Sequence, residues 1–253
     1  MDSIYSEFLK LKRSMSWAVI LLLPIIMVTA GTTSTIAGGG EFNDWHVLWI
    51  RSIGFYGMAI VSVGIAILAS LVWRVEHKNG NWNALMSRPV PTAQVVIGKI
   101  AAISILAAAM QIVFVLTVIA TGKALGIPGM LPNQYLFSSA LIIVACVPVA
   151  ALQSALSTFF RSFAVPVAIA LVLTGASTMA LLLKIEVISM LPYAALTRAT
   201  QIGTVLVSGE RTSFDVPALT PESALLVIVI SAVSTAVIIA ATSVILNRSD
   251  TRT

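Results

Sequence analysis

The sequence has few charged residues and almost no cysteine. Only 10% of its 253 residues are charged and 58% are hydrophobic, whereas soluble domains have about 25% charged and 45–50% apolar residues. This composition excludes a water-soluble enzyme and a disordered chain. A net charge of +5, with cations scattered between apolar runs, also argues against nucleic-acid binding. Cys146 is the single cysteine, so no internal disulfide forms. A polytopic membrane protein remains.

Motifs for catalysis, metal binding and nucleotide binding are missing as well. The two histidines, His46 and His77, flank different apolar runs, which disfavours a shared metal site. Gly98-Lys99 and Gly122-Lys123 lack the upstream glycine and the Ser/Thr of a P-loop. No Ser/His/Asp set or Gly-x-Ser-x-Gly motif is present. The chain is therefore predicted not to be an enzyme by itself and to hold no cofactor.

Six apolar runs are long enough to cross a membrane, which takes roughly 20 residues. They predict an all-α polytopic membrane protein, with residues 1–253 forming a single transmembrane domain. The first run is longer than the apolar part of a signal peptide, about 7–15 residues, so we expect a retained helix. The runs are Trp17–Ala37, Ile53–Trp73, Ile100–Ala120, Leu136–Thr158, Ala164–Leu183 and Ala224–Leu246.

The distribution of lysine and arginine predicts the orientation. With the N-terminus in the cytoplasm, ten of the fifteen basic residues fall on the cytoplasmic side. Both termini are then cytoplasmic. The ten are Lys10, Lys12, Arg13, Arg74, Lys78, Arg88, Lys99, Arg161, Arg248 and Arg252.

The N-terminal residues 1–16 show helical periodicity. Ile4, Phe8, Leu11 and Met15 recur at spacings of four, three and four, which places them on one face. This pattern favours an amphipathic helix lying in the membrane interface, with Trp17 as its anchor. An ordinary charged flank of the first span is the alternative.

Residues 74–99 form the largest predicted cytoplasmic segment. After a turn at Gly80, Trp82, Leu85 and Met86 lie on one side of a short helix that ends before Pro89. Such a helix suits docking into the groove of a partner protein. Anchoring of Trp82 at the lipid headgroups explains the same pattern equally well.

Three segments are predicted on the opposite side. Gly38–Ser52 and Thr121–Tyr135 are expected to be short loops rich in glycine or proline. Residues 184–223 are only moderately apolar, with Pro192, Arg198 and Gln201 in their first half. A pair of short helices partly dipping into the membrane fits this segment, provided that protein buries them. An exposed loop with one interfacial helix is the alternative.

The six runs contain no Asp, Glu, Lys or Arg, which disfavours a proton-driven transporter and a voltage sensor. Gln111 and Gln153 are the largest polar side chains within them. We expect these amides to form hydrogen bonds between helices, and the alternative is that they line a substrate path. A transporter without an ion site or ATP site needs another chain to supply energy.

This layout resembles the membrane subunits of ABC transporters of the ABC-2 type. The loop carries Glu76, a turn at Gly80, an aliphatic-aromatic helix, Pro89 and then Gly98-Lys99, which is similar to the family's first cytoplasmic loop. Asn81 to Leu85 look most like the small permeases of lantibiotic immunity and bacitracin-type peptide resistance. The same pattern lacks the longer charged run that is usual in this loop.

The resemblance implies a half-transporter in a bacterial cell membrane. Two such permease chains, identical or different, would bind two soluble ATP-binding cassette subunits that hold ATP and Mg. The assembly would expel an amphipathic substrate, such as an antimicrobial peptide, in keeping with the export activity of most of the family. Trp82 and Leu85, with Met86 beside them, would be the apolar contacts to the ATPase, and Gly80 would form the turn. Glu76, Lys78 and Arg88 would surround them. A membrane scaffold or sensor subunit is the alternative function.

Overall fold

The computed structural model describes residues 14–77, 91–183, 185, 191–202 and 219–250, and this part of the chain is helical throughout apart from short connections. Six helices are long and apolar enough to cross a membrane, which confirms the predicted fold class. They are α2 (Ser16–Ala37), the continuous run of α3 (Trp45–Phe55), η1 (Tyr56–Ile60) and α4 (Val61–His77), α6 (Thr92–Ala124), α7 (Asn133–Phe159), α8 (Ala164–Leu182) and α10 (Pro221–Asp250). A short helix, α9 (Pro192–Gln201), lies between the last two.

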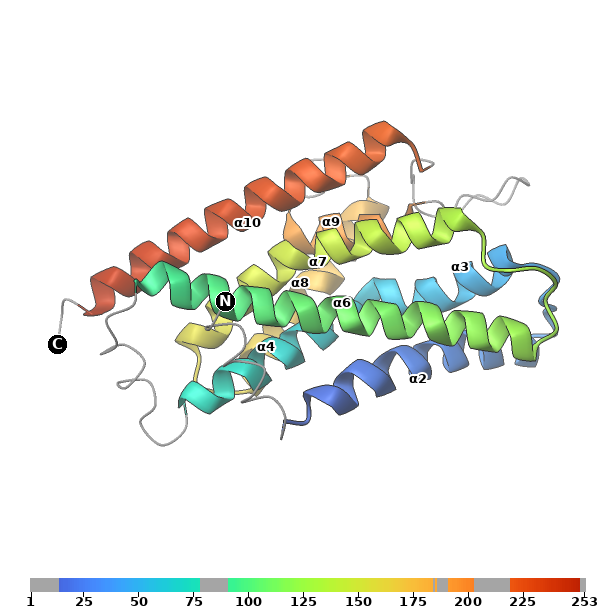
Figure 1. Ribbon diagram of the computed structural model, residues 1–253, viewed down its shortest axis with the longest axis horizontal. Helices are drawn as coiled ribbons and strands as arrows, with labels where there is room; N and C mark the ends of the chain where they lie inside the picture. Colours follow the sequence, from blue (N-terminus) through green and yellow to red (C-terminus); the bar gives the residue numbers. More distant parts are fainter. Residues whose placement is uncertain (1–13, 78–90, 184, 186–190, 203–218, 251–253) are drawn as a thin grey trace.

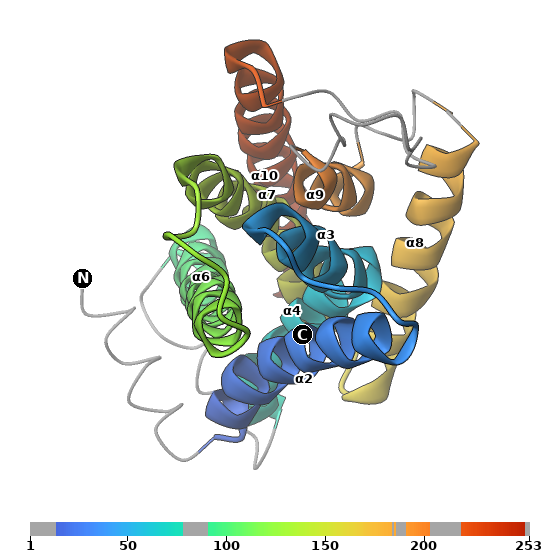
Figure 2. The same cartoon turned by 90° about the vertical axis from the view of Figure 1, so that its right-hand side faces the viewer.

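The long helices run along the long axis of the molecule as a bundle (Figure 1). We call the end where α4 stops and α6 starts the His77 end, and the end where α2 stops and α10 starts the Ala37 end. Helix α7 is central, because it packs against α4, α6, α9 and α10. Helices α8 and α10 lie at the periphery (Figure 2). They expose large apolar side chains such as Val172 and Leu225, as expected of helices that face lipid.

Aromatic side chains form the core near the Ala37 end. Trp49 stacks on Tyr135 with ring centroids 4.9 Å apart, and Tyr56 stacks on Phe114 at 4.5 Å. Trp49 also meets Phe114 edge-on at 5.6 Å, so the four rings form one continuous group. All four side chains are buried. Aromatic pairs in this geometry add about 0.5–1.5 kcal/mol each beyond their buried area, which fixes α3, α6 and α7 relative to one another.

The prediction of a loop over Gly38–Ser52 is wrong for its second half, because α3 begins at Trp45. The side chain of Asp44 caps this helix by accepting a hydrogen bond from the Val47 backbone N–H at 2.8 Å. The inward face is buried at helical spacing by Trp45, Leu48, Trp49 and Ser52. The second span is therefore 33 residues long, from Trp45 to His77.

The predicted cytoplasmic segment 74–99 is shortened by helix at both ends. Helix α4 continues to His77 and α6 already begins at Thr92, directly after Pro91. Residues 1–13 and 78–90 lie outside the described residues. The predicted interfacial helix and the short helix around Trp82 therefore stay predictions.

Helix α9 lies between the spans and not beyond their ends. It packs against α3, η1, α7, α8 and α10, and Figure 2 shows it between α10, α3 and α8. The hydroxyl of Tyr193, at its start, accepts a hydrogen bond from Gln153 of α7. Just after its end, the carbonyl of Ile202 accepts one from Ser138 at 3.3 Å. The prediction of a short helix that dips between the spans therefore fits α9, whereas the alternative of an exposed loop with one interfacial helix does not.

Burial by protein allows a helix of this composition to lie at that depth. Eight of the ten residues of α9 are buried, including the polar Thr197, Thr200 and Gln201. The Thr200 hydroxyl donates to the Thr197 carbonyl at 2.7 Å. A polar helix of ten residues cannot face lipid, but it is tolerated where other helices surround it. The second short helix predicted for 184–223 falls in residues that are not described.

Gly57 provides the space that α9 needs. A Cβ atom added at Gly57 would lie 2.3 Å from the Thr200 hydroxyl oxygen and 2.5 Å from its Cβ. Gly57→Ala is therefore expected to destabilise the chain by about 1–3 kcal/mol through overpacking, measured as a lower unfolding temperature in detergent. Gly54→Ala is the matched control, because its Cβ would meet nothing within 4 Å. Equal stability of the two variants would contradict the close packing of α9 on η1.

Candidate functional site

A buried ion pair lies at the base of the first loop, where the chain leaves α4 and returns into α6. The ammonium of Lys99 donates to the Glu76 carboxylate at 2.8 Å, and the two side chains are only 1% and 5% exposed. Glu76 is the residue before the end of α4 at His77, and Lys99 lies about two helical turns after the start of α6 at Thr92. The pair therefore fixes the two helices that carry residues 78–91.

Tryptophan and histidine extend this polar group to α7. The Lys99 ammonium lies 5.2 Å from the centroid of the Trp73 ring, within cation–π range. The Trp73 indole N–H donates to the Ser154 hydroxyl at 2.9 Å. His77 Nε2 lies 2.7 Å from the Ser157 carbonyl oxygen, so that nitrogen carries the proton. Hydrogen bonds and an ion pair thus join α4, α6 and α7 at the His77 end.

The predicted ATPase contacts fall mostly outside the described residues. Lys78, Gly80, Trp82, Leu85, Met86 and Arg88 all belong to the segment 78–90. Glu76 is described, and its carboxylate is turned into the protein toward Lys99 and not into solvent. In this structure the Glu76 side chain is thus buried near the end of α4, and its role as a contact to the ATPase stays a prediction. Sequence reasoning missed both the burial and the pair, because the two residues are separated by 23 positions.

The two glutamines join helices, as expected of amides within spans. Gln111 of α6 donates to the Ser139 hydroxyl of α7 at 3.3 Å, and Gln153 of α7 donates to the Tyr193 hydroxyl of α9. Both side chains are fully buried, and both carboxamide oxygens have no hydrogen-bond partner. The structure does not bring the two amides into one site, and the substrate-path alternative stays a prediction.

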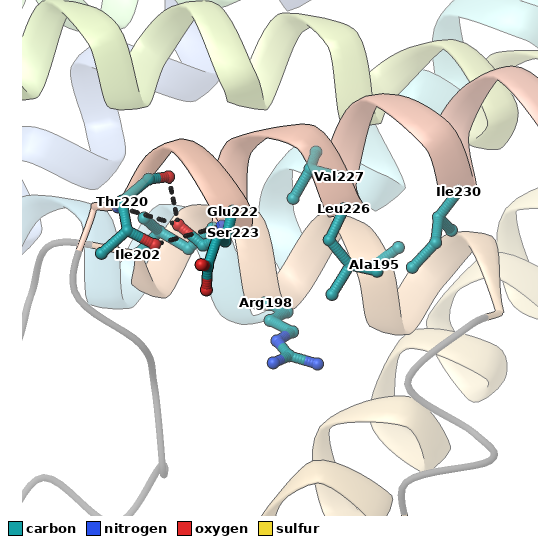
Figure 3. Close-up of a pocket in the computed structure, with 9 residues that line it drawn as sticks. All are labelled: Ala195, Arg198, Ile202, Thr220, Glu222, Ser223, Leu226, Val227 and Ile230. Carbon is teal, nitrogen blue, oxygen red and sulfur yellow. Dashed lines mark hydrogen bonds between the residues drawn. The ribbon is translucent and has the colours of Figure 1, made fainter.

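A pocket of about 220 Å³ lies between α9 and α10 near the Ala37 end (Figure 3). Its apolar side is formed by Ala195, Leu226 and Ile230, and its rim carries Arg198 and Glu222. The two charged side chains extend to the same side of the helices in Figure 3. Sequence reasoning missed this pocket, because it depends on the depth of α9. The pocket offers an apolar wall and both signs of charge to a ligand.

The geometry of these sites supports binding and mechanical connection between helices. In the described ranges, no group of three or more His, Cys, Asp or Glu residues could hold a metal ion. At the His77 end, the Glu76–Lys99 ion pair holds α4 and α6 together. At the Ala37 end, the pocket between α9 and α10 combines apolar and charged side chains.

Comparison with known families agrees with this arrangement. Residues 3–177 match the family described as ABC-2 family transporter protein, a stretch that includes residues 78–91 and most of α8. The match covers more than half of the chain, so the protein belongs to the ABC-2 family of transporter membrane proteins. It is thus a multi-pass permease subunit of an ABC transporter, a class that works with ATP-binding subunits. No curated protein and no solved structure matches the chain.

Proposed function

We propose that the chain exports or expels an amphipathic substrate, an antimicrobial peptide such as a lantibiotic, using ATP hydrolysed by a separate subunit. The observation that carries the mechanism is the Glu76–Lys99 pair beneath the first loop. ATP and Mg belong to the partner subunits in this proposal. The chain contributes the loop that receives their movement and the helices that transmit it.

Movement of the ATPase would reach the helices through the contacts at the base of the first loop. Residues 78–90 include the apolar Trp82, Leu85 and Met86, which would insert into a groove of the ATPase, with Lys78 and Arg88 beside them. Displacement of this loop would act on α4 and α6 together, because the buried pair holds their ends. Bonds from Trp73 and His77 would carry the displacement to α7.

The pocket between α9 and α10 supports the amphipathic nature of the substrate. Leu226 and Ile230 offer apolar contact, while Arg198 and Glu222 offer charges of both signs. A cationic or zwitterionic peptide with an apolar face would meet both kinds of surface. A second permease chain, identical or homologous, would complete the assembly in a bacterial cell membrane with both termini in the cytoplasm.

The experiment that tests this function is purification of the tagged chain from its native membrane in mild detergent. We expect a stoichiometric soluble ATPase to purify with it and the complex to hydrolyse ATP with Mg present. Addition of a lantibiotic to the reconstituted complex should raise that activity. The control is the same preparation with an unrelated soluble peptide of equal charge.

Two other results would contradict all or part of this proposal. A chain that purifies without any ATPase activity would contradict the transporter mechanism and favour the scaffold or sensor alternative. An active complex that ignores lantibiotics but responds to another amphiphile would retain the mechanism and overturn the peptide assignment.

A further inference from the structure

A cavity of about 340 Å³ opens at the His77 end, between the last turns of α4 and the connection from α7 to α8. Arg74 and His77 approach it from α4, and Arg161 from the connection. Two buried serines, Ser70 and Ser157, also line it. The cavity thus combines cationic groups with hydroxyls at one end of the membrane-spanning bundle.

The charge of this cavity is of one sign. None of the eight described residues that line it is acidic. The guanidinium groups of Arg74 and Arg161 form neither a hydrogen bond nor an ion pair with another part of the chain that the structure describes. The site is therefore complementary to an anion.

The apolar part of the lining indicates what kind of anion fits. Phe160 and Phe163 flank Arg161, and 42% and 43% of their surfaces are exposed. A phenylalanine ring has no polar group, so these two side chains add purely apolar surface at the end of α7 and the start of α8. Here they place apolar surface directly beside the two arginines. An anionic amphiphile would satisfy both, whereas a free small anion would use only the charges.

We propose that this cavity binds the headgroup of an anionic phospholipid from the adjacent leaflet. Arg74 and Arg161 would donate to the phosphodiester oxygens, for which guanidinium groups have matching geometry. Phe160 and Phe163 would contact the first part of the acyl chains. Basic pockets between membrane-spanning helices are a general form of lipid headgroup site. The inference does not rest on the proposed transport function, because it needs neither an ATPase nor a substrate.

A lipid bound in this cavity would also affect how α4 packs against α7. Ser157, which lines the cavity, also accepts the hydrogen bond from His77 through its carbonyl. A lipid held at this position would stabilise the contact between α4 and α7 beside the Glu76–Lys99 pair. The activity of the assembled transporter would then depend on the anionic lipid content of the membrane.

Native mass spectrometry of the full chain tests the site directly. The chain in mild detergent is titrated with phosphatidylglycerol or with phosphatidylcholine carrying the same acyl chains. We expect wild type to retain phosphatidylglycerol preferentially, and Arg74→Gln/Arg161→Gln to bind it about thirtyfold more weakly. The matched control is Arg51→Gln/Lys123→Gln, which removes two exposed cations near the Ala37 end and should bind as wild type does.

Further results of this experiment distinguish a bound lipid from free phosphate and from the ATPase subunit. Equal phosphatidylglycerol binding by the Arg74/Arg161 variant and wild type would overturn the proposal. Displacement of the lipid by millimolar inorganic phosphate would show a free-phosphate site instead. Loss of the bound lipid whenever the ATPase subunit is present would identify the cavity as part of the protein interface. Retention in the complex, with ATPase activity that rises with phosphatidylglycerol in nanodiscs for wild type only, supports the lipid site.

Discussion

Replacing Glu76 with glutamine is expected to destabilise the chain by about 3–5 kcal/mol, because it removes the negative charge next to a buried ammonium. Lys99 is 1% exposed and lies 2.8 Å from the carboxylate. In the variant, the charge of Lys99 would face a neutral amide in a site shielded from water. The measurement is thermal unfolding in detergent, followed by the loss of monodisperse protein.

The control for this variant is Glu222→Gln, because Glu222 is an exposed carboxylate at the start of α10. An exposed substitution of this kind usually changes stability by no more than about 0.5 kcal/mol. Glu76→Leu/Lys99→Leu should recover most of the lost stability, since an apolar pair of similar volume often replaces a buried ion pair without loss. A Glu76→Gln variant as stable as Glu222→Gln would show that the pair contributes little.

The double variant also separates stability from transmission. If the ion pair only holds the helices together, Glu76→Leu/Lys99→Leu should keep both its fold and its effect on the ATPase. If the directional hydrogen bond between α4 and α6 transmits movement, the double variant should fold and bind the ATPase but show weaker substrate-stimulated hydrolysis. The mechanism proposed above requires the second outcome.

The spans could be predicted because their signal is local. A run of about 20 apolar residues is favourable in lipid as a helix whatever its neighbours are, and all six predicted runs are helices. Where a helix extends beyond its apolar run, the sequence indicates it by a capping residue and by helical spacing of the buried side chains. Trp45, Leu48, Trp49 and Ser52 follow helical spacing behind a capping Asp44. The prediction of a loop over Gly38–Ser52 missed this pattern, because residues 38–44 before it are glycine-rich.

The sites depend on contacts between distant segments and were harder to predict. The composition of 184–223 allowed two positions for its short helix, and long-range contacts such as the packing of Thr200 against Gly57 decide between them. Likewise, Glu76 and Lys99 were each read as loop residues. Two antiparallel helices joined by a short connection must bring their facing ends together, so an acid at the end of one span and a lysine at the start of the next were the available indication of a pair.

The coupling role that we propose for the first loop leads to the prediction with the most direct functional readout. Trp82→Ala is expected to weaken ATPase binding by about thirtyfold or more, because truncation of a central aromatic anchor typically costs about 2 kcal/mol or more. The sequence places Trp82 on one side of a short helix with Leu85 and Met86. The measurement is the amount of ATPase that purifies with the variant, together with its ATP hydrolysis.

Trp17→Ala provides the matched control. Trp17 is also predicted on the cytoplasmic side, and 51% of its surface is exposed at the start of α2. Both substitutions remove an indole that could anchor the chain at lipid headgroups, but only Trp82 lies in the predicted docking helix. Selective loss of the ATPase with Trp82→Ala therefore identifies a protein contact. Equal, small effects of the two substitutions would assign Trp82 to the lipid interface and would require another part of the His77 end to receive the ATPase.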